Sequence, residues 1–309
     1  MVGVVLSVLM LKTLRLHTDN TQLMDKSLRL LLTGEWTHFG NTATKVGNIP
    51  GTFLTFITSL PMAVYFSAWS AGFVILVFHL GSYFLLRKSI GQIFDNNAVS
   101  LAQATILLSV VYWLNPWRVE QVELYNPGFI FLFAAGHLYT SLRMTEKNFW
   151  LTFFHVLIVG FCFQVHFSFL VLALVSLFLF LRQQIKVSWP GFVSGTVVVL
   201  MSLLPFVLTR FFSSEVLANQ EIQNLDFSKS DAYFGRNLIF VYPVLKAIWY
   251  FFRMGSVYGG RHVFSEINFN WIDQEWVRTF FDLSFHFLKW VAAAASMAVS
   301  LTFMGRFLK

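Results

Sequence analysis

The side chains best suited to chemistry begin in a long polar stretch, residues 17–50, which follows the first apolar run of the chain. Asp19 lies just beyond that run. Partial burial at a membrane boundary would raise the pKa of this carboxyl group toward working pH, so Asp19 is a candidate general base toward a hydroxyl group. The alternative is that Asp19 caps a helix that the pattern predicts over residues 21–33, as Asp often does.

A second group of charged side chains lies within LNPWRVEQVELYNPG, residues 114–128. Glu120 and Glu123 are three residues apart, so a helical turn would place both on one face, with Arg118 close by. Asn-Pro pairs mark both ends of the stretch, the second one at Asn126. Charges at a membrane interface are functional candidates by default. The alternative is an interfacial cluster that only ends two helices.

A third polar interruption is FQVHFS, residues 163–168, where two apolar segments must turn. Gln164 and His166 are candidates to bind a sugar hydroxyl or a phosphate. The alternative for His166 is a hydrogen-bonded packing role. The other histidines within apolar runs have no partner in the sequence and are predicted to serve packing: His79, His137 and His155.

Several common motifs are missing from the sequence. It contains no HExxH or CxxC metal spacing, no Walker A motif, no Rossmann glycine fingerprint and no GxSxG elbow. Coupling to ATP within this chain is therefore disfavoured. A divalent ion held by acids from separated loops is left open.

The composition indicates a membrane protein. Of 309 residues, 56% are hydrophobic and only 12% are charged, whereas soluble domains carry about 25% charged residues. The apolar runs are long enough, or nearly so, to cross a hydrocarbon core of about 30 Å, and a barrel would show short alternating segments that do not occur here. The runs fall at roughly 2–16, 51–66, 71–86, 99–114, 127–142, 150–165, 167–181, 189–209, 238–252 and 288–305.

The net charge of +7 does not indicate nucleic-acid binding, because the Lys and Arg residues fall mostly at the ends of apolar runs. Every second connection between runs is basic, which makes these connections cytoplasmic by the positive-inside rule. If the N-terminus is cytoplasmic as well, the first loop faces outward. The single cysteine, Cys162, excludes an internal disulfide and is expected to pack. The basic pairs are Arg87/Lys88, Arg143/Lys147 and Arg182/Lys186.

An outward first loop requires an odd number of crossings before Arg87, yet two apolar runs lie between them. The run at 51–66 is short and contains Pro61, so we expect it to be re-entrant or membrane-parallel, as irregular backbone is allowed where protein or a wet cavity lines it. Residues 254–287 alternate aromatic and charged side chains, which suits the headgroup interface.

We therefore predict an all-α fold: a polytopic transmembrane helical bundle of about 9–10 apolar segments, with membrane-parallel helices in its first extracytoplasmic loop. The whole chain, residues 1–309, is expected to form one domain. Its short first run and its stop at GRFLK, just after an apolar run, leave open whether further segments belong to it.

These features together resemble a known family. The block consists of an apolar first span, an outward loop with Asp19 and Gly34, and a Gly/Pro entry at residues 47–51, followed by NPWRVEQVELYNP and FQVHFS. It looks like the bacterial membrane glycosyltransferases of the GT-C superfamily, in the family 39-like group that includes polyprenyl-phosphate-mannose protein mannosyltransferases and aminoarabinose transferases. The resemblance covers residues 16–204.

The resemblance implies a site on the periplasmic face of the bacterial inner membrane. The donor would be a polyprenyl-phosphate-linked sugar, and transfer would go to a lipid, glycan or protein acceptor. By likeness, Asp19 takes the place of the first-loop catalytic acid, and Glu120 and Glu123 that of a second-loop acid that assists or binds a divalent metal. The side chains expected to bind substrate are His38, Lys45, Arg118, Asn126, Gln164 and His166.

Two other classes of protein fit the same sequence. A lipid or saccharide transporter or flippase would line a path with Glu120, Glu123 and His166 and would place broken helices near the midplane. A non-catalytic subunit of envelope polysaccharide assembly would tolerate Asp19→Asn. The scarcity of charge within the apolar runs favours the enzyme over the transporter.

Overall fold

The computed structural model describes residues 18–43, 47–94, 98–114, 124, 126–212 and 272–281, with isolated positions between 283 and 298. The described chain is mostly helical and contains one short pair of strands. Each apolar run predicted between residues 51 and 209 coincides with one helix, which confirms the helical part of the prediction. The runs at 2–16, 238–252 and 288–305 lie outside the described ranges.

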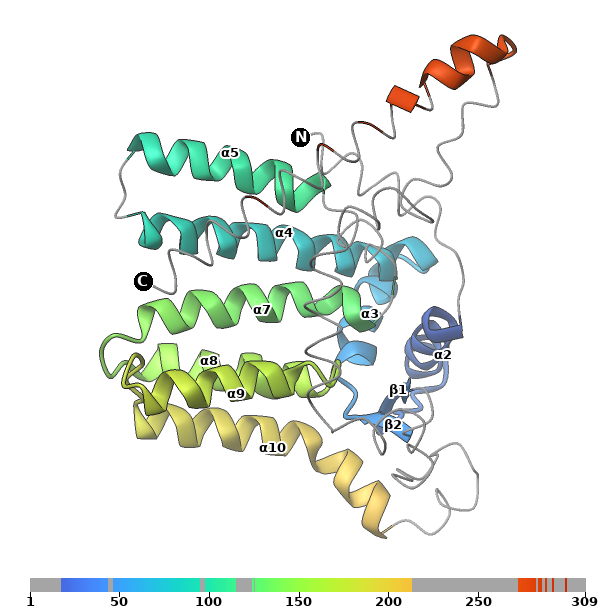
Figure 1. The fold of residues 1–309 in the computed structure, drawn as a ribbon. Helices are drawn as coiled ribbons and strands as arrows, with labels where there is room; N and C mark the ends of the chain where they lie inside the picture. Colours follow the sequence, from blue (N-terminus) through green and yellow to red (C-terminus); the bar gives the residue numbers. More distant parts are fainter. Residues whose placement is uncertain are drawn as a thin grey trace, which may run out of the picture.

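The long helices lie side by side in one bundle (Figure 1). Helix α4 packs on α7, α7 packs on α8, and α8 packs on α10. Their bounds are α4 Ala68–Ile93, α5 Ala98–Leu114, α7 Asn126–Arg143, α8 Phe149–Phe163, α9 Phe169–Leu181 and α10 Trp189–Phe212.

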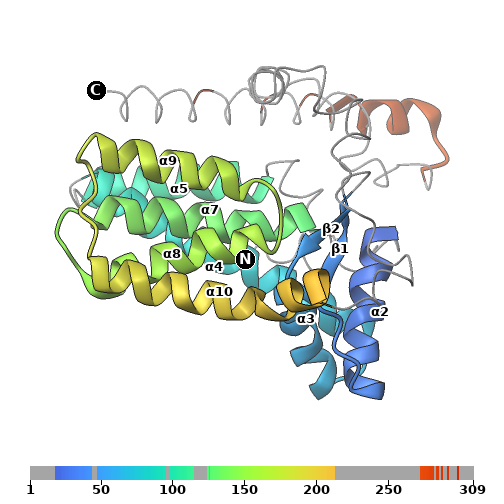
Figure 2. The same ribbon diagram turned by 90° about the horizontal axis from the view of Figure 1, so that it is seen from below.

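A smaller layer crosses one end of this bundle (Figure 2). It contains helix α2 (Thr18–Thr33), strands β1 (Phe39–Ala43) and β2 (Gly47–Pro50), and helix α3 (Phe53–Val64). Helix α2 packs on α3 and β1. At 12 residues and 1.5 Å per residue, α3 is too short to match a hydrocarbon core of about 30 Å.

The two strands correct the all-α prediction. They pair antiparallel, Thr42 with Asn48 and Ala43 with Gly47, and the register shifts between Phe39 and Thr42. The segment FGNTATKVGNIP has small and polar residues where a strand pattern would alternate apolar and polar ones, so its sequence gives little strand signal. Its pairing depends on the helices against which it packs.

Local signals set several helix ends. The Ser67 hydroxyl accepts a hydrogen bond from the Trp69 N–H, and the Asn148 side chain accepts one from the Leu151 N–H, so both residues act as N-caps. Gly34, at φ +70°, follows the last residue of α2 in the left-handed conformation that commonly ends a helix.

The bundle has two unlike ends. The predicted basic pairs lie at the end away from the hairpin (Figure 1). Arg87/Lys88 lie within the C-terminal part of α4 and not in a connection, Arg143/Lys147 lie at and after the end of α7, and Arg182/Lys186 follow α9. Two described helices are long and apolar enough to cross a membrane, Trp69–Ile93 and Trp189–Thr209, and the shorter apolar helices are Phe53–Val64, Phe149–Phe163 and Phe169–Leu181.

One hydrophobic core joins the crossing layer to the bundle. Leu23 of α2, Leu54 of α3, Ile75 of α4 and Phe129 of α7 belong to the same buried cluster. Cys162 is buried in this cluster as a free thiol, in keeping with its predicted packing role. The crossing layer is therefore packed against the long helices over apolar surface.

Glycines allow α8 and α10 to pack closely. A Cβ at Gly160 would lie 2.3 Å from Val199, a Cβ at Gly191 would lie 2.4 Å from the Phe149 carbonyl oxygen, and one at Gly195 would lie 2.9 Å from Val156. Gly191 and Gly195 are four residues apart on one face of α10. This is the small-xxx-small spacing that lets apolar helices approach one another in lipid.

Gly191→Ala should destabilise the chain, because the added methyl group would collide with a backbone oxygen that cannot rotate away. Overpacking costs about 1–3 kcal/mol, against the ~1 kcal/mol that Ala gains over Gly in a helix. Gly81→Ala in α4 is the matched control, since its methyl group would meet only the Leu132 side-chain end, at 3.1 Å. Thermal unfolding in detergent should show a lower Tm for Gly191→Ala alone. Equal Tm values would contradict close α8–α10 packing.

Candidate functional site

Segments from distant parts of the sequence come together at the end of the bundle that carries the hairpin (Figure 2), and several of their polar side chains are joined by hydrogen bonds. They come from β1, the β2–α3 connection, the first turn of α7, the α8–α9 turn and α10. We call this group the polar junction. Its members are Asn41, Gly51, Asn126, Gln164, His166 and Ser202.

Asn126 connects three of these segments. It is the first residue of α7 and is 5% exposed. Its Nδ2 donates a hydrogen bond to the Val165 carbonyl oxygen at 2.9 Å, and its Oδ1 accepts one from Nδ2 of Asn41 at 3.2 Å. A buried amide needs such partners, so Asn126 fixes the hairpin and the α8–α9 turn against the start of α7.

Gln164 connects the α8–α9 turn to α10 and to the hairpin exit. It is 2% exposed, and its Nε2 donates to the Ser202 hydroxyl at 2.6 Å. Gly51, at φ +80°, lies against the same amide: a Cβ there would lie 2.3 Å from Oε1 of Gln164. Both the backbone conformation and the close approach require glycine at this position.

His166 lies in the α8–α9 turn, where it caps the next helix. The Ser168 N–H donates to Nδ1 of His166 at 3.1 Å, and the Ser168 hydroxyl lies 2.8 Å from the same nitrogen. Nδ1 therefore carries the lone pair, and Nε2 holds the proton of the neutral ring. Burial lowers the pKa of His166, which favours this neutral, capping form.

The predicted substrate ligand His38 lies immediately before β1 and is half-buried. Its buried Nδ1 has no hydrogen-bond partner among the described residues, and the same holds for the neighbouring Thr37 hydroxyl. These two adjacent polar atoms face no protein donor or acceptor in the described chain.

The sequence analysis missed Lys26. This residue of α2 is 9% exposed, its ammonium group donates to the Gly40 carbonyl oxygen, and it lies 4.9 Å from the centre of the Phe39 ring. Lys26 follows the buried Leu23 by three residues, and this helical spacing could have placed it on the buried face. By contrast, Asp25 forms an exposed ion pair with Arg29 at 2.9 Å, as expected of a solvated charge.

Other predicted site residues cannot be placed in the junction. Helix α2 begins at Thr18 and not at residue 21, so Asp19 falls within its first turn; the Asp19 side chain lies outside the described part. Four further predicted residues lie outside the described ranges altogether: Lys45, Arg118, Glu120 and Glu123.

The histidines predicted to pack have hydrogen-bond partners in the structure. Nε2 of His137 and Nε2 of His155 both lie within hydrogen-bond distance of the Ser176 hydroxyl, at 2.7 and 2.8 Å. Nδ1 of His155 lies 2.7 Å from the Thr140 hydroxyl. This network links α7, α8 and α9. A second pair, His79 and Tyr112, links α4 to α5 at 3.2 Å.

No group of three or more His, Cys, Asp or Glu side chains that could hold a metal ion occurs in the described part of the chain. Comparisons with protein-family models, with curated proteins and with solved structures found no match. The function of the junction is therefore argued from its own residues.

The stability contributed by neutral His166 should depend on pH. The pKa of an unfolded His is about 6.5, and burial lowers the folded value, so the unfolded chain binds more protons as pH falls. This stability is fully present above pH ~6.5 and is lost as pH falls through the folded pKa. His166→Asn keeps an acceptor that does not titrate. When thermal unfolding is measured at about pH 7.5 and at about pH 5, the wild-type Tm should fall more between the two pH values than the Tm of the variant. A constant difference would contradict the capping role.

Proposed function

We propose that this chain is a polytopic membrane glycosyltransferase of the GT-C type, which moves a sugar from a polyprenyl-phosphate donor to an extracytoplasmic acceptor. The observation that carries the proposal is the polar junction: Asn126 binds the first-loop hairpin on one side and the α8–α9 turn on the other. One described residue from each of the three stretches that carry the family resemblance, Asn41, Asn126 and Val165, takes part in these hydrogen bonds.

The surface of the helices supports a membrane setting. Large apolar side chains are exposed along α9 and α10, including Phe178 and Met201. Phe56, Leu60 and Val64 are exposed along α3, as suits a helix lying in the membrane interface. Basic connections at the opposite end orient that end to the cytoplasm, so the polar junction would face the periplasm of a bacterial inner membrane.

In the proposed reaction, Asp19 removes the proton of an acceptor hydroxyl or amine. The acceptor oxygen or nitrogen then forms a bond to the anomeric carbon of the sugar, while the bond from that carbon to the phosphate oxygen breaks. The electron pair leaves with polyprenyl phosphate, whose charge would be stabilised by Arg118 or Lys45. Glu120 or Glu123 would assist, or would hold a divalent ion.

The junction itself would position these loops. Asn126 and Gln164 use their amides to hold other parts of the chain, and His38 offers a nitrogen without a partner among the described residues. His38 is therefore the better candidate in the described loop to contact a sugar hydroxyl. The amide residues would act by fixing the loop that presents it.

The transporter alternative draws on one observation, the network of His137, His155 and Ser176 inside the bundle. These groups hydrogen-bond to one another, and Ser176 also donates to the Leu172 carbonyl oxygen at 2.8 Å. A translocation path needs polar groups that are available to a substrate. A network that is satisfied by its own members favours a packing role.

The proposed mechanism makes Asp19→Asn a strong test. Removing a general base should slow transfer by about 100-fold or more, measured as sugar release from polyprenyl-phosphate hexoses and pentoses by mass spectrometry. Asp25→Asn is the matched control on the same helix, because Asp25 is exposed and pairs only with Arg29 and solvent in the described chain. It should release sugar at the wild-type rate.

Two outcomes would contradict the proposal. Equal release by wild type and Asp19→Asn would exclude the general base, and would fit a non-catalytic subunit. No release from any donor by a wild-type protein that retains its helical circular dichroism would exclude the enzyme.

A further inference from the structure

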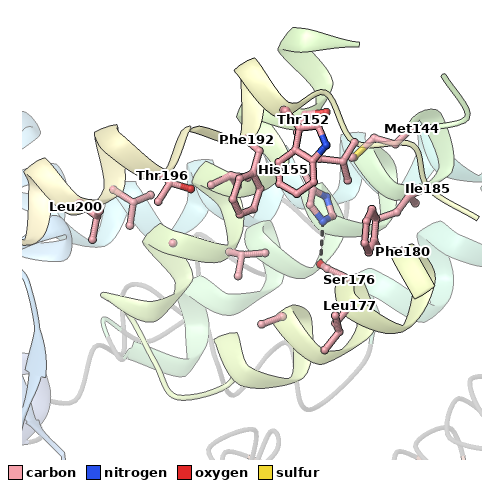
Figure 3. A pocket seen from close by; sticks show the side chains of 17 residues that line it. Met144, Thr152, His155, Ser176, Leu177, Phe180, Ile185, Phe192, Thr196 and Leu200 are labelled. Atoms are coloured by element: carbon pink, nitrogen blue, oxygen red, sulfur yellow. Dashed lines mark hydrogen bonds between the residues drawn. The ribbon is translucent and has the colours of Figure 1, made fainter. Parts of the chain in front are cut away.

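A cavity of about 480 Å³ lies on the side of the bundle, between α9 and α10 and over α8 (Figure 3). Its volume lies in the range of small-molecule and lipid-chain sites. Apolar side chains from both helices form its walls. Those used below are Ala173, Leu177 and Phe180 of α9, and Phe192 and Leu200 of α10.

Three polar groups that line this cavity, those of His155, Ser176 and Thr152, have hydrogen-bond partners. His155 lines the cavity, and its two ring nitrogens lie within hydrogen-bond distance of Thr140 and Ser176; the Ser176 contact is visible in Figure 3. The Thr152 hydroxyl accepts a hydrogen bond from the Ser188 N–H at 3.0 Å. Around His155 and Thr152, the cavity therefore offers a ligand mainly apolar contacts.

One end of the cavity lies beneath the connection between α9 and α10. Ile185 and Val187 of this connection line the cavity. In the same connection, Arg182 precedes Ile185 by three residues and Lys186 lies between Ile185 and Val187; both cations are exposed and form no ion pair with an acidic side chain in the described chain. The connection that covers this end of the apolar cavity thus carries two exposed cations.

The adjacent α7–α8 connection adds to this positive charge. It contributes Lys147 and Arg143 at the same end of the bundle, with Glu146 as the acid between them. Met144 of this connection also lines the cavity, and its carbonyl oxygen accepts a hydrogen bond from the Lys186 N–H at 2.7 Å. The hydrogen bond holds the two basic connections together over this end of the cavity.

We propose that this cavity holds one hydrocarbon chain of an anionic phospholipid, whose phosphate group is bound by Arg182 and Lys186. The two cations select the ligand, because basic pockets between membrane helices on the cytoplasmic side bind anionic headgroups. The apolar floor requires a hydrocarbon chain below the headgroup. The bound phosphate would lie at the end of the bundle away from the polar junction, and the cavity extends from there along α10 to Leu200, two residues before Ser202 of the junction.

The consequence is structural support for α9 and α10. Helix α9 packs on α7 and α8, and α10 packs on α8. A lipid chain between α9 and α10 would fill the space that their side chains leave, and its phosphate would fix the connection that joins them. The inference depends on the membrane setting proposed above and not on glycosyl transfer.

The test is lipid retention by the purified full-length chain in mild detergent, measured by native mass spectrometry. Phosphatidylglycerol should be retained at least about 5-fold better than phosphatidylcholine with the same chains, and the double variant Arg182→Gln/Lys186→Gln should lose roughly 30-fold, or about 5-fold for each cation. Arg87→Gln/Lys88→Gln is the charge-matched control, because that pair lies in the C-terminal part of α4 and does not line the cavity. It should bind like wild type.

A second pair of variants tests the cavity. Ala173→Phe should fill it and abolish preferential retention of phosphatidylglycerol. Val171→Phe on the same helix should have no effect, because Val171 is exposed and does not line the cavity. Unchanged circular dichroism and Tm confirm that each variant is folded.

Three results would overturn the proposal. The first is equal retention of the two phospholipids. The second is an equal loss in both charge variants, which would indicate surface charge alone. The third is tighter binding of undecaprenyl phosphate than of phosphatidylglycerol at this site. Because the readout is lipid binding, failure of the proposed transfer activity leaves these results unaffected.

Discussion

The described structure depends on the need of one buried amide for partners. Asn126 begins α7 in an apolar setting, where an unpaired amide would cost about 1–3 kcal/mol. Its side chain is satisfied only if β1 and the α8–α9 turn both come to the start of α7. Asn126 thereby holds β1, the start of α7 and the α8–α9 turn next to one another. Gln164 extends the same constraint to α10, and Gly51 permits the close approach.

Apolar packing provides the rest of the contact between the crossing layer and the bundle. The crossing layer of α2, α3 and the hairpin shares a buried cluster with α4 and α7, and glycines bring α8 against α10. The two ends of the bundle then differ in chemistry. Amides, hydroxyls and a histidine gather at one end, and the basic connections gather at the other. In the proposed membrane setting these two ends would face opposite sides of the bilayer, and the proposed functions use both.

The sequence predicts the helices well because apolar runs between polar connections leave few alternatives. It also singled out Asn126, Gln164 and His166, which the structure shows bonded to other parts of the chain; their predicted role in substrate binding stays a prediction. It could not identify Asn41, whose partner is 85 residues away, or the hairpin, whose small residues lack an alternating pattern. Lys26 was missed because a Lys beside Asp25 resembles a solvated pair, and only the packing of α2 against β1 buries it. The acids at 120 and 123 stay predictions, since they lie outside the described ranges.

The most direct measurement of the central claim is the proximity of the hairpin to the start of α7 in the membrane. Asn41→Cys/Asn126→Cys, in a Cys162→Ser background, would be treated in membranes with a short bifunctional thiosulfonate reagent and analysed for linked peptides by mass spectrometry. The account predicts efficient linking of this pair, and none for Asn41→Cys/Lys147→Cys, whose second cysteine lies at the other end of the bundle. It would be contradicted if positions 41 and 126 each reacted with a monofunctional reagent but did not link, or if both pairs linked equally.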